Sequence, residues 1–307
     1  MLDSLHIQNY RLFKDLTIEK LARVNLIAGK NNCGKTALLE ALMLFANKAD
    51  INVISFILKQ RDEILFRQVK DAYNLYNNKA AGIILIGNTT ELIQFTTEPK
   101  YQKPNGEVIY PFDFGLNDAE IIHLPIDKSI FVPLNTSLDF DAKLWDTVSL
   151  TPEEDDVINI LRIIEPKLSK FRFDAKKTKI LLEGQTQPMP LKKAGDGINR
   201  LLSIALALVN AKNKLLLIDE FEVGLHHSVQ EQLWEIIFKY AQEWDIQVFV
   251  TTHSLDTVRS FSTVLDKNPD VGQYLRLQKS RMTGDVEAVV YSQKSLDFAI
   301  EDTLEMR

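Results

Sequence analysis

Residues 29–36, GKNNCGKT, have the glycine, lysine and threonine spacing of a loop that binds phosphate groups. The backbone amides of such a loop, and of a helix that starts inside it, present positive partial charge to an anion. Lys35 is expected to contact the β- and γ-phosphates of a nucleoside triphosphate, and the Thr36 hydroxyl to bind Mg²⁺. Gly29 and Gly34 permit backbone angles that other residues rarely adopt. The other residues expected at the nucleotide are Asn31, Asn32, Cys33 and Ala37.

Two carboxylates end the apolar run of residues 214–218, KLLLI. Such a run is typical of a parallel strand buried on both faces, and its carboxyl end would lie at the sheet edge where open α/β sheets bind ligands. Asp219 is suited to hold Mg²⁺ directly or through water, and Glu220 to orient and deprotonate an attacking water. A strand that merely ends in a surface turn would look the same, but the phosphate loop earlier in the chain favours the catalytic interpretation.

A second apolar run, residues 246–250, leads through two threonines to His253. At the end of a neighbouring strand, His253 would reach the same sheet edge and could contact a γ-phosphate as a neutral or charged donor. Residues 195–197, Gly-Asp-Gly, precede an apolar helical pattern and offer free amides to an anion. Gly195, Asp196 and Gly197 are therefore candidate nucleotide contacts, although Asp196 could instead cap the helix.

The elements that must position these motifs are visible in the first fifty residues. Strands are expected at residues 5–7, at the end of residues 9–18 and at residues 24–27, and a helix at residues 35–47. Arg11 and Phe13 lie early enough to reach the base or ribose of a nucleotide by stacking and cation–π contact. The alternative is that Phe13 belongs to the core and Arg11 is a surface charge.

The pattern loosens in the middle of the chain. Residues 51–76 have helical spacing, and Thr151 is expected to cap a helix that has Pro152 in its first turn and runs to about residue 164. His123 stands alone in an apolar run, which favours a structural histidine. Further strands are expected at residues 82–86, 92–96, 108–110, 121–124, 130–132, 171–173, 179–183, 274–279 and 286–291, and a last helix at about 295–304.

Composition limits the class of protein. The chain of 307 residues is 45% hydrophobic and 25% charged, and its net charge of −6 argues against a uniformly basic nucleic-acid coat. No apolar run approaches the roughly 18 residues of a membrane span, and residues 1–4 do not resemble a signal peptide. The single cysteine, Cys33, fits a reducing cytoplasm. It is expected to be a small filler of the loop, with a redox role as the alternative.

The order of these motifs resembles the ABC-type ATPases, and within them the soluble AAA-labelled group related to the SMC, double-strand-break-repair and overcoming-lysogenization-defect proteins. Residues 9–13, NYRLF, resemble the opening motif of that group, and residues 29–36 its Walker A loop. Residues 195–197 stand at the signature, 215–220 at the Walker B strand and 224–226 at the D-loop, and His253 corresponds to the switch histidine.

The resemblance implies an α/β fold, a P-loop NTPase of ABC type with a mixed sheet flanked by helices. Residues 1–47 and 129–307 would form the ATPase domain, and residues 48–128 an α+β insertion subdomain between Walker A and the signature. The signature lacks the usual serine, so a contact to the γ-phosphate of another copy would use backbone amides, Asn199 or Arg200. The position of the Q-loop glutamine is not evident, and residues 133–137 are the best candidate. About fifty residues follow His253, which is too short for the nuclease domain of some relatives.

The preferred function is an ATPase that binds ATP and Mg²⁺ between two copies in a head-to-tail homodimer, or in a higher oligomer. Since the chain has its own phosphate loop, a second anion-binding helix start suggests contact with a nucleotide on a sister molecule. The resemblance implies a regulator of a separate effector protein in bacterial antiviral defence. An alternative is a repair or recombination ATPase that closes on DNA, for which the lysines between residues 167 and 193 are candidates. A subunit of a membrane importer fits less well, and no membrane partner is expected.

Overall fold

The computed structural model describes residues 1–63, 75–77, 84–95, 101–102, 108–109, 128–174, 177–195 and 197–301. Three expected features lie outside these residues: Asp196, the strand at residues 121–124 with His123, and most of the helical pattern after residue 63. The chain forms two compact units. Unit 1 contains Met1–Leu21, Gly29–Ser129 and Arg276–Val289, and unit 2 contains Ala22–Ala28, Ile130–Leu275 and Val290–Arg307.

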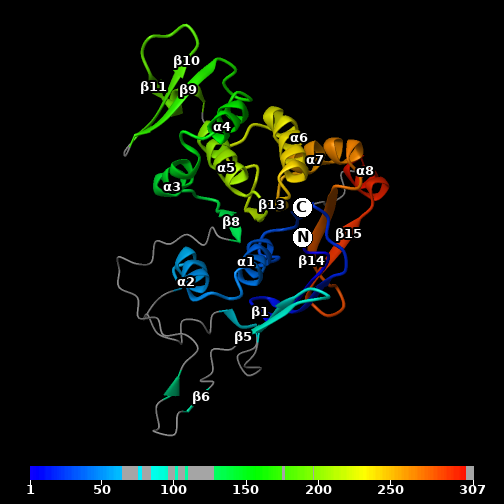
Figure 1. Cartoon of the computed structure of the whole chain (residues 1–307). Coiled ribbons are helices and arrows are strands. Elements are labelled where there is room, and N and C mark those ends of the chain that lie inside the picture. Colours follow the sequence, from blue (N-terminus) through cyan, green and yellow to red (C-terminus); the bar gives the residue numbers. More distant parts are fainter. Residues whose placement is uncertain are drawn as a thin grey trace. The chain divides into compact units, whose positions relative to one another are not determined.

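Unit 1 is built on an antiparallel sheet with the strand order β2-β1-β4-β5. Its strands are β1 (Leu5–Tyr10), β2 (Phe13–Ile18), β4 (Ile84–Gly87) and β5 (Leu92–Phe95). Helix α1 (Lys35–Ala46) packs against β4, and α2 (Ile51–Gln60) packs against α1. A short pair, β6 (Tyr101–Gln102) and β7 (Val108–Ile109), completes the described strands (Figure 1). The strands expected at residues 82–86 and 92–96 are confirmed as β4 and β5, which pair antiparallel.

Unit 2 contains the sheet that carries the acidic and histidine motifs, with the order β15-β14-β3-β13-β12-β8. Its strands are β3 (Val24–Ala28), β8 (Ser129–Val132), β12 (Leu215–Ile218), β13 (Gln247–Thr252), β14 (Gly272–Lys279) and β15 (Val286–Tyr291), of which β14 and β15 continue into unit 1. The central strands β3, β13 and β12 are parallel. Every residue of β3 and β13 is buried, as expected for strands covered on both faces.

Among the described residues, the helices of unit 2 are α3 (Leu138–Val148), α4 (Glu153–Leu161), α5 (Ile198–Asn210), α6 (His227–Glu243), α7 (Leu255–Lys267) and α8 (Gln293–Glu301). Helix α5 packs against α3, α4 and β12, while α7 packs against α6, α8 and β3. A small antiparallel sheet next to α4 consists of β9 (Leu168–Asp174), β10 (Lys177–Leu182) and β11 (Met189–Pro190) (Figure 1). The mixed α/β fold with flanking helices is thereby confirmed.

Two local expectations differ from the structure. Thr151 does not cap α4, because its hydroxyl donates to the carbonyl of Val148 at 2.7 Å and Pro152 occupies the N-cap position. Helix α3 was not expected from the sequence, although its N-terminus is capped by Ser137, whose hydroxyl accepts a hydrogen bond from the Phe140 amide. Among the described residues, no helix is long and apolar enough to cross a membrane.

Candidate functional site

The phosphate loop follows β3 directly and ends where α1 begins at Lys35. A Cβ atom on Gly34, which has φ 98°, would lie 2.8 Å from the ring of Phe13. A Cβ atom on Gly29 would lie 2.5 Å from Cys33 Sγ and from the carbonyl oxygen of Leu277. Both glycines are therefore required by the close packing of the loop within unit 1, where a side chain at either position would clash with its neighbours.

The loop of unit 1 is arranged to receive an anion. Lys35 is buried, and its Nζ donates to the carbonyls of Gly29 at 2.9 Å and Lys30 at 3.1 Å. The N-cap residue of α1 is Gly34, which has no side-chain oxygen to accept from the first amides of the helix, and no acidic residue stands in the first turn. An ammonium group and uncapped helix amides in one loop suit the phosphate groups of a nucleotide.

Cys33 is a packing residue rather than a reactive thiol. The side chain is buried against the loop, and burial raises the pKa of the Cys33 thiol, although the charge of Lys35 acts in the opposite direction. Since the thiolate is the reactive form, burial and the raised pKa favour the packing role of Cys33.

Phe13 and Arg11 of the opening motif have their contacts inside unit 1. Phe13 is fully buried and packs against the phosphate loop, which confirms its assignment to the core. Arg11 pairs with Glu63 at 2.7 Å and with Glu40 of α1 at 3.4 Å. Glu40 also binds Arg61 at 2.6 Å. The Arg11 guanidinium is thus paired with carboxylates of its own unit, and the nucleotide contact expected for it stays a prediction.

In unit 2, the carboxyl ends of β12 and β13 are joined by hydrogen bonds around Thr251. Its hydroxyl donates to Asp219 Oδ1 at 2.6 Å and accepts from the amide of Glu220 at 2.8 Å. The Thr251 carbonyl accepts from the amide of Phe221 at 3.0 Å. Asp219 is buried, whereas the Glu220 side chain is 28% exposed. The chain turns sharply at Glu220, which has φ 50°, so the two adjacent carboxylates occupy different environments.

His253 follows β13 and lies beside two carboxylates. Its Nδ1 is 3.8 Å from Glu220 Oε1 and 3.1 Å from Glu222 Oε1. The His253 side chain is 44% exposed, so a ligand can reach it. Unit 2 therefore brings together Asp219, Glu220 and His253, which the sequence placed at the ends of two different strands.

The signature segment of unit 2 packs directly on the D-loop. A Cβ atom on Gly197 would overlap the carbonyl oxygen of Gly224. Gly195 has φ 132° and lies at the end of the 3₁₀ turn Leu191–Ala194. Gly197 is the N-cap of α5 and supplies no side-chain cap, so the start of α5 can still present amides to an anion.

Arg200 of α5 is bound inside the chain. Its Nη1 donates to the carbonyl of Pro133 at 2.6 Å, and its Nη2 donates to the carbonyls of Asp219 at 2.5 Å and Glu220 at 3.3 Å. The residue is 7% exposed. The guanidinium therefore holds the ends of β8 and β12 of its own chain. A contact of Arg200 with a nucleotide on another copy stays a prediction.

A family of known proteins matches this chain. The family described as "AAA domain, putative AbiEii toxin, Type IV TA system" matches residues 58–259, more than half of the sequence. The chain belongs to this family. It is an ATPase of the AAA type.

Individual relatives of this AAA domain are distant. A Helicobacter pylori protein named "ATP/GTP phosphatase" is 23% identical over 330 residues, covering 86% of this chain and 88% of that protein. The uncharacterized Methanocaldococcus jannaschii protein MJECL10 is 38% identical over 79 residues, covering 25% of this chain and 36% of that protein.

Solved structures show the fold. The SMC head domain from Thermotoga maritima has a TM-score of 0.51 and 14% identity, covering 95% of this chain and 99% of that one. An SMC head bound to the C-winged helix domain of ScpA has a TM-score of 0.57 and 12% identity, covering 95% and 97%. The AAA domain therefore has the SMC-head fold.

The sequence did not reveal the hydrogen bonds of three residues that join the motifs of unit 2: Thr251, Arg200 and Glu222. The carboxylate of Glu222 accepts from the His253 amide and from the Thr252 hydroxyl, both at 2.8 Å. The sequence signal for Glu222 was a third acidic residue close behind the Walker B pair. Its partners lie 30 and 31 positions further along the chain, so only the pairing of β12 with β13 reveals them.

The remaining candidates have structural contacts. His226, the last residue of the D-loop segment, caps α6, because its Nδ1 accepts from the Ser228 amide at 3.3 Å. In the segment proposed as the Q-loop, the Pro133 carbonyl binds Arg200, and the Thr136 hydroxyl lies 2.9 Å from that of Ser203. No group of histidine, cysteine and acidic residues that could hold a metal ion by themselves occurs in the described part of the chain.

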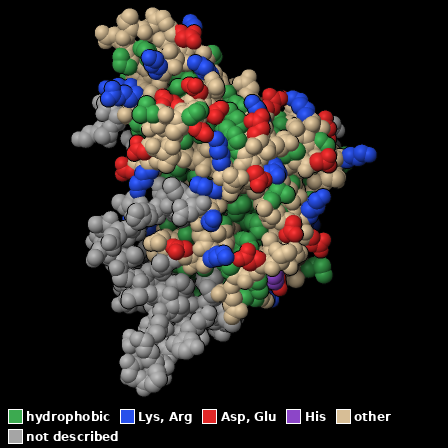
Figure 2. Space-filling view, in the orientation of Figure 1, with side chains coloured by type: hydrophobic (Ala, Val, Ile, Leu, Met, Phe, Trp, Pro, Cys, Tyr) green, Lys and Arg blue, Asp and Glu red, His purple; other side chains and the backbone are tan. Residues whose placement is uncertain are grey.

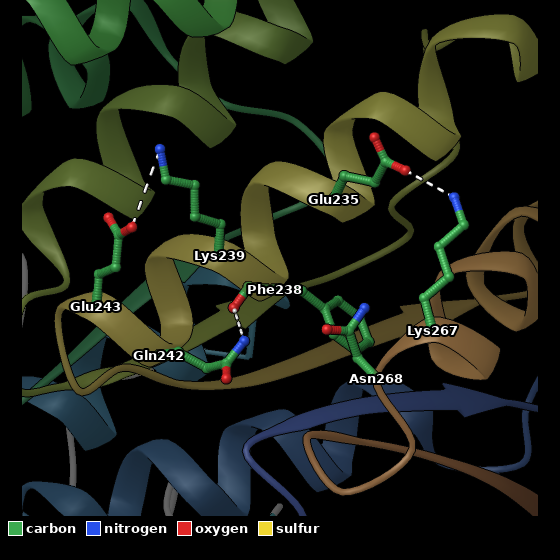
Figure 3. A pocket seen from close by; sticks show the side chains of 7 residues that line it. All are labelled: Glu235, Phe238, Lys239, Gln242, Glu243, Lys267 and Asn268. Carbon is green, nitrogen blue, oxygen red and sulfur yellow. Dashed lines mark hydrogen bonds and ion pairs between the residues drawn. The ribbon is translucent and has the colours of Figure 1, made fainter.

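A pocket of about 370 Å³ lies elsewhere on unit 2 (Figure 3). Its lining comes from the C-terminal half of α6 and the end of α7 and includes Phe238, Lys239, Glu243 and Lys267. None of the nucleotide motifs contributes to it. Its opposite charges are already paired, Lys239 with Glu243 at 3.9 Å and Lys267 with Glu235 at 2.9 Å, so the pocket does not compete with the motif cluster as the functional site.

Basic side chains gather on the small sheet of unit 2. Lys170 and Arg172 are exposed on β9, and Lys179 of β10 is the direct partner of Arg172. Lys192 and Lys193 are exposed on the 3₁₀ turn. Over the face drawn in Figure 2, basic and acidic side chains are interspersed, so the basic character is local.

Proposed function

We propose that this AAA domain hydrolyses ATP in a cycle that pairs two copies head to tail, and that the pairing controls a separate effector protein. The observation that carries the proposal is the cluster in unit 2, where Glu220 and His253 lie 3.8 Å apart beside the buried Asp219. A carboxylate able to take a proton and an imidazole able to donate to a phosphate are the groups that hydrolysis of a phosphoanhydride needs.

In the proposed reaction, water attacks the γ-phosphorus, the bond to the β–γ bridging oxygen breaks, and ADP and phosphate leave. Glu220 orients the water and accepts its proton, and its partial exposure gives water access. His253 donates to the γ-phosphate. Lys35, already buried in the loop of unit 1, supplies positive charge to the phosphate oxygens.

Each unit also carries an oxygen ligand of the type that Mg²⁺ prefers. The hydroxyl of Thr36 and the carboxylate of Asp219 are oxygen ligands, the type this ion prefers, and we propose them as its protein ligands. Bound there, Mg²⁺ would neutralise charge on the phosphate oxygens. Thr251 would serve the same purpose indirectly, because its hydroxyl donates to Asp219 Oδ1 and so fixes this carboxylate.

The proposed pairing of two copies depends on the start of α5. Gly195 and Gly197 stand before a helix whose N-cap supplies no side chain, and Arg200 holds that helix in place. The chain has its own phosphate loop, so we propose that these amides contact the nucleotide bound by a sister molecule. An SMC head of the same fold is known in a complex with part of ScpA, which supports a separate protein partner. The toxin–antitoxin description of the family supports a role in bacterial defence.

Two substitutions test the proposal. Lys35→Ala should abolish ATP binding, measured by titration with a fluorescent ATP analogue, while Lys14→Ala on the exposed surface of unit 1 should not. Glu220→Gln should retain ATP binding, lower turnover by about 100-fold or more and accumulate an ATP-bound dimer on a sizing column. Wild-type turnover in Glu220→Gln would show that the catalytic assignment is wrong.

A second candidate function is ATP-dependent binding of DNA, favoured by the adjacent Lys170, Arg172 and Lys179 on one small sheet. Binding of duplex DNA should then weaken steeply with salt and be lost on charge reversal of Lys170 and Arg172. Equal binding by this variant and the wild type would remove the candidate.

A further inference from the structure

Glu222 lies close to both the backbone amide and the ring of His253. Its Oε1 accepts a hydrogen bond from the His253 amide at 2.8 Å and lies 3.1 Å from Nδ1 of the His253 ring. Glu220, the proposed catalytic base, is further from that nitrogen, at 3.8 Å. Nδ1 makes no hydrogen bond to any described residue, so the hydrogen bond of Glu222 is to the amide and the ring lies within ion-pair distance of the same oxygen. A carboxylate placed in this way restricts the position of the ring relative to the strand that carries it.

The second oxygen of Glu222 fixes the turn that contains the histidine. Oε2 accepts from the Thr252 hydroxyl at 2.8 Å, and the same hydroxyl accepts from the Ser254 amide at 3.0 Å. Ser254 is the N-cap of α7. One carboxylate, on a side chain that is 12% exposed, therefore contacts the whole passage from β13 through His253 into α7.

The contacts of Glu222 with Thr252 and His253, which we call the clasp, are separate from the contacts that hold β12 and β13 together. Thr251 joins β13 to Asp219, Glu220 and Phe221, and none of these bonds involves Glu222. Loss of the Glu222 carboxylate should therefore free His253 without separating β12 from β13. A purely structural role would predict the opposite, a general loosening of the strand ends.

We propose that Glu222 is a positioning residue, which holds the His253 imidazole where it can act on the γ-phosphate. Because Glu222 lies in the turn just before Gly224 of the D-loop, any movement of that turn would also move the histidine. The inference rests on the proposed role of His253 in hydrolysis, and it adds the residue that sets the position of this group. It predicts an effect on turnover rather than on ATP binding.

The first test measures the clasp without ATP. Amide hydrogen exchange of residues 252–254 should accelerate about tenfold or more in Glu222→Ala, because the His253 amide loses a charged acceptor. Exchange in β12 and in the first part of β13 should stay as in the wild type. Glu222→Gln, which retains one acceptor oxygen, should fall between the two. Unchanged exchange at residues 252–254, or equal acceleration throughout both strands, would overturn the clasp.

The second test measures steady-state ATP hydrolysis. Glu222→Ala should lower kcat by about 10- to 100-fold with a change in KM of less than about threefold, as is typical when a residue that orients a catalytic group is lost. Glu222→Gln should restore part of kcat, and Glu243→Gln on α6 serves as the control. A kcat within about twofold of the wild type in Glu222→Ala would contradict the positioning role.

A double substitution shows whether Glu222 acts through the histidine. In the His253→Ala background, Glu222→Ala should lower kcat by less than about twofold, because the group it positions is gone. An undiminished further loss would mean that Glu222 acts by another route and would refute the inference. If His253→Ala alone has wild-type turnover, the proposed role of His253 fails instead, and the exchange data still decide whether the clasp exists.

Discussion

Asp141 should make the stability of unit 2 depend on pH. Its side chain is 5% exposed in α3, and its Oδ2 accepts a hydrogen bond from Ser203 at 3.0 Å. Its Oδ1 accepts no hydrogen bond from any residue that the structure describes. Burial raises the pKa of Asp141 from 3.8 to about 7, although the Ser203 bond and the charge of Arg200 act in the opposite direction. The carboxyl group is therefore protonated in the folded protein at pH values where the unfolded chain has lost that proton.

The sign and size of the effect follow from proton linkage. Between pH 3.8 and about 7 the folded state binds more protons at Asp141 than the unfolded state does, so the free energy of unfolding falls as the pH rises. Each pH unit in this window costs about 1.4 kcal/mol, and the full difference amounts to about 4 kcal/mol. Above about pH 7 both states are ionised and the dependence on pH ends.

Urea unfolding at pH 5, 6, 7 and 8 tests this prediction. The three tryptophans, Trp145, Trp234 and Trp244, lie in unit 2, so their fluorescence reports on its unfolding. Asp141→Asn is neutral at every pH, and its stability relative to the wild type should rise by about 1.4 kcal/mol per pH unit up to about pH 7. The exposed Asp139 in the same turn provides the control, since Asp139→Asn should shift stability by the same amount at each pH. A constant difference between Asp141→Asn and the wild type would refute the reasoning.

Two further substitutions examine the contacts of α5. Arg200→Ala should lower the free energy of unfolding of unit 2 by about 2–5 kcal/mol in the same fluorescence assay, because three carbonyls lose a charged donor. Arg259→Ala is the control, because the Arg259 side chain on α7 is exposed. If Arg200→Ala lowers the free energy of unfolding by less than about 1 kcal/mol, the structural role assigned to Arg200 is contradicted. Gly197→Ala should cost about 1–3 kcal/mol and lower ATP turnover, because the added Cβ would overlap the Gly224 carbonyl. Wild-type stability together with wild-type turnover in Gly197→Ala would show that this contact is not tight.

The parts of the molecule that were predictable from the sequence are those whose signals are local. The phosphate loop joins a strand, a glycine-bracketed turn and a helix within about twenty consecutive residues, and the structure has β3 and α1 in those places. The run before Asp219 is a buried strand for the same reason. Helix α3 also had a local signal, because Phe140, Leu144 and Val148 recur at helical spacing behind the capping residue Ser137.

The contacts that the sequence did not reveal join residues distant along the chain. Thr251 meets Asp219 across 32 positions, and Arg200 reaches Pro133 across 67. Such pairs depend on which strands are neighbours and in which register, and single-residue patterns do not contain that information. The ion pairs of Arg11 are of the same kind. Two carboxylates, one on α1 and one just after α2, bind its guanidinium, and neither is close to it in the sequence.

The contacts of Gly197, Arg200 and Glu222 connect the start of α5 to the whole motif cluster of unit 2. Gly197 at the start of α5 touches the Gly224 carbonyl, Arg200 of the same helix holds the carbonyls of Asp219 and Glu220, and Glu222 holds His253. Most of the partners are backbone atoms, which do not move independently of their strands. A sister molecule that bound the start of α5 would therefore displace the acidic residues and the histidine together. Pairing of two copies could in this way control hydrolysis through packing alone, without a dedicated switch segment.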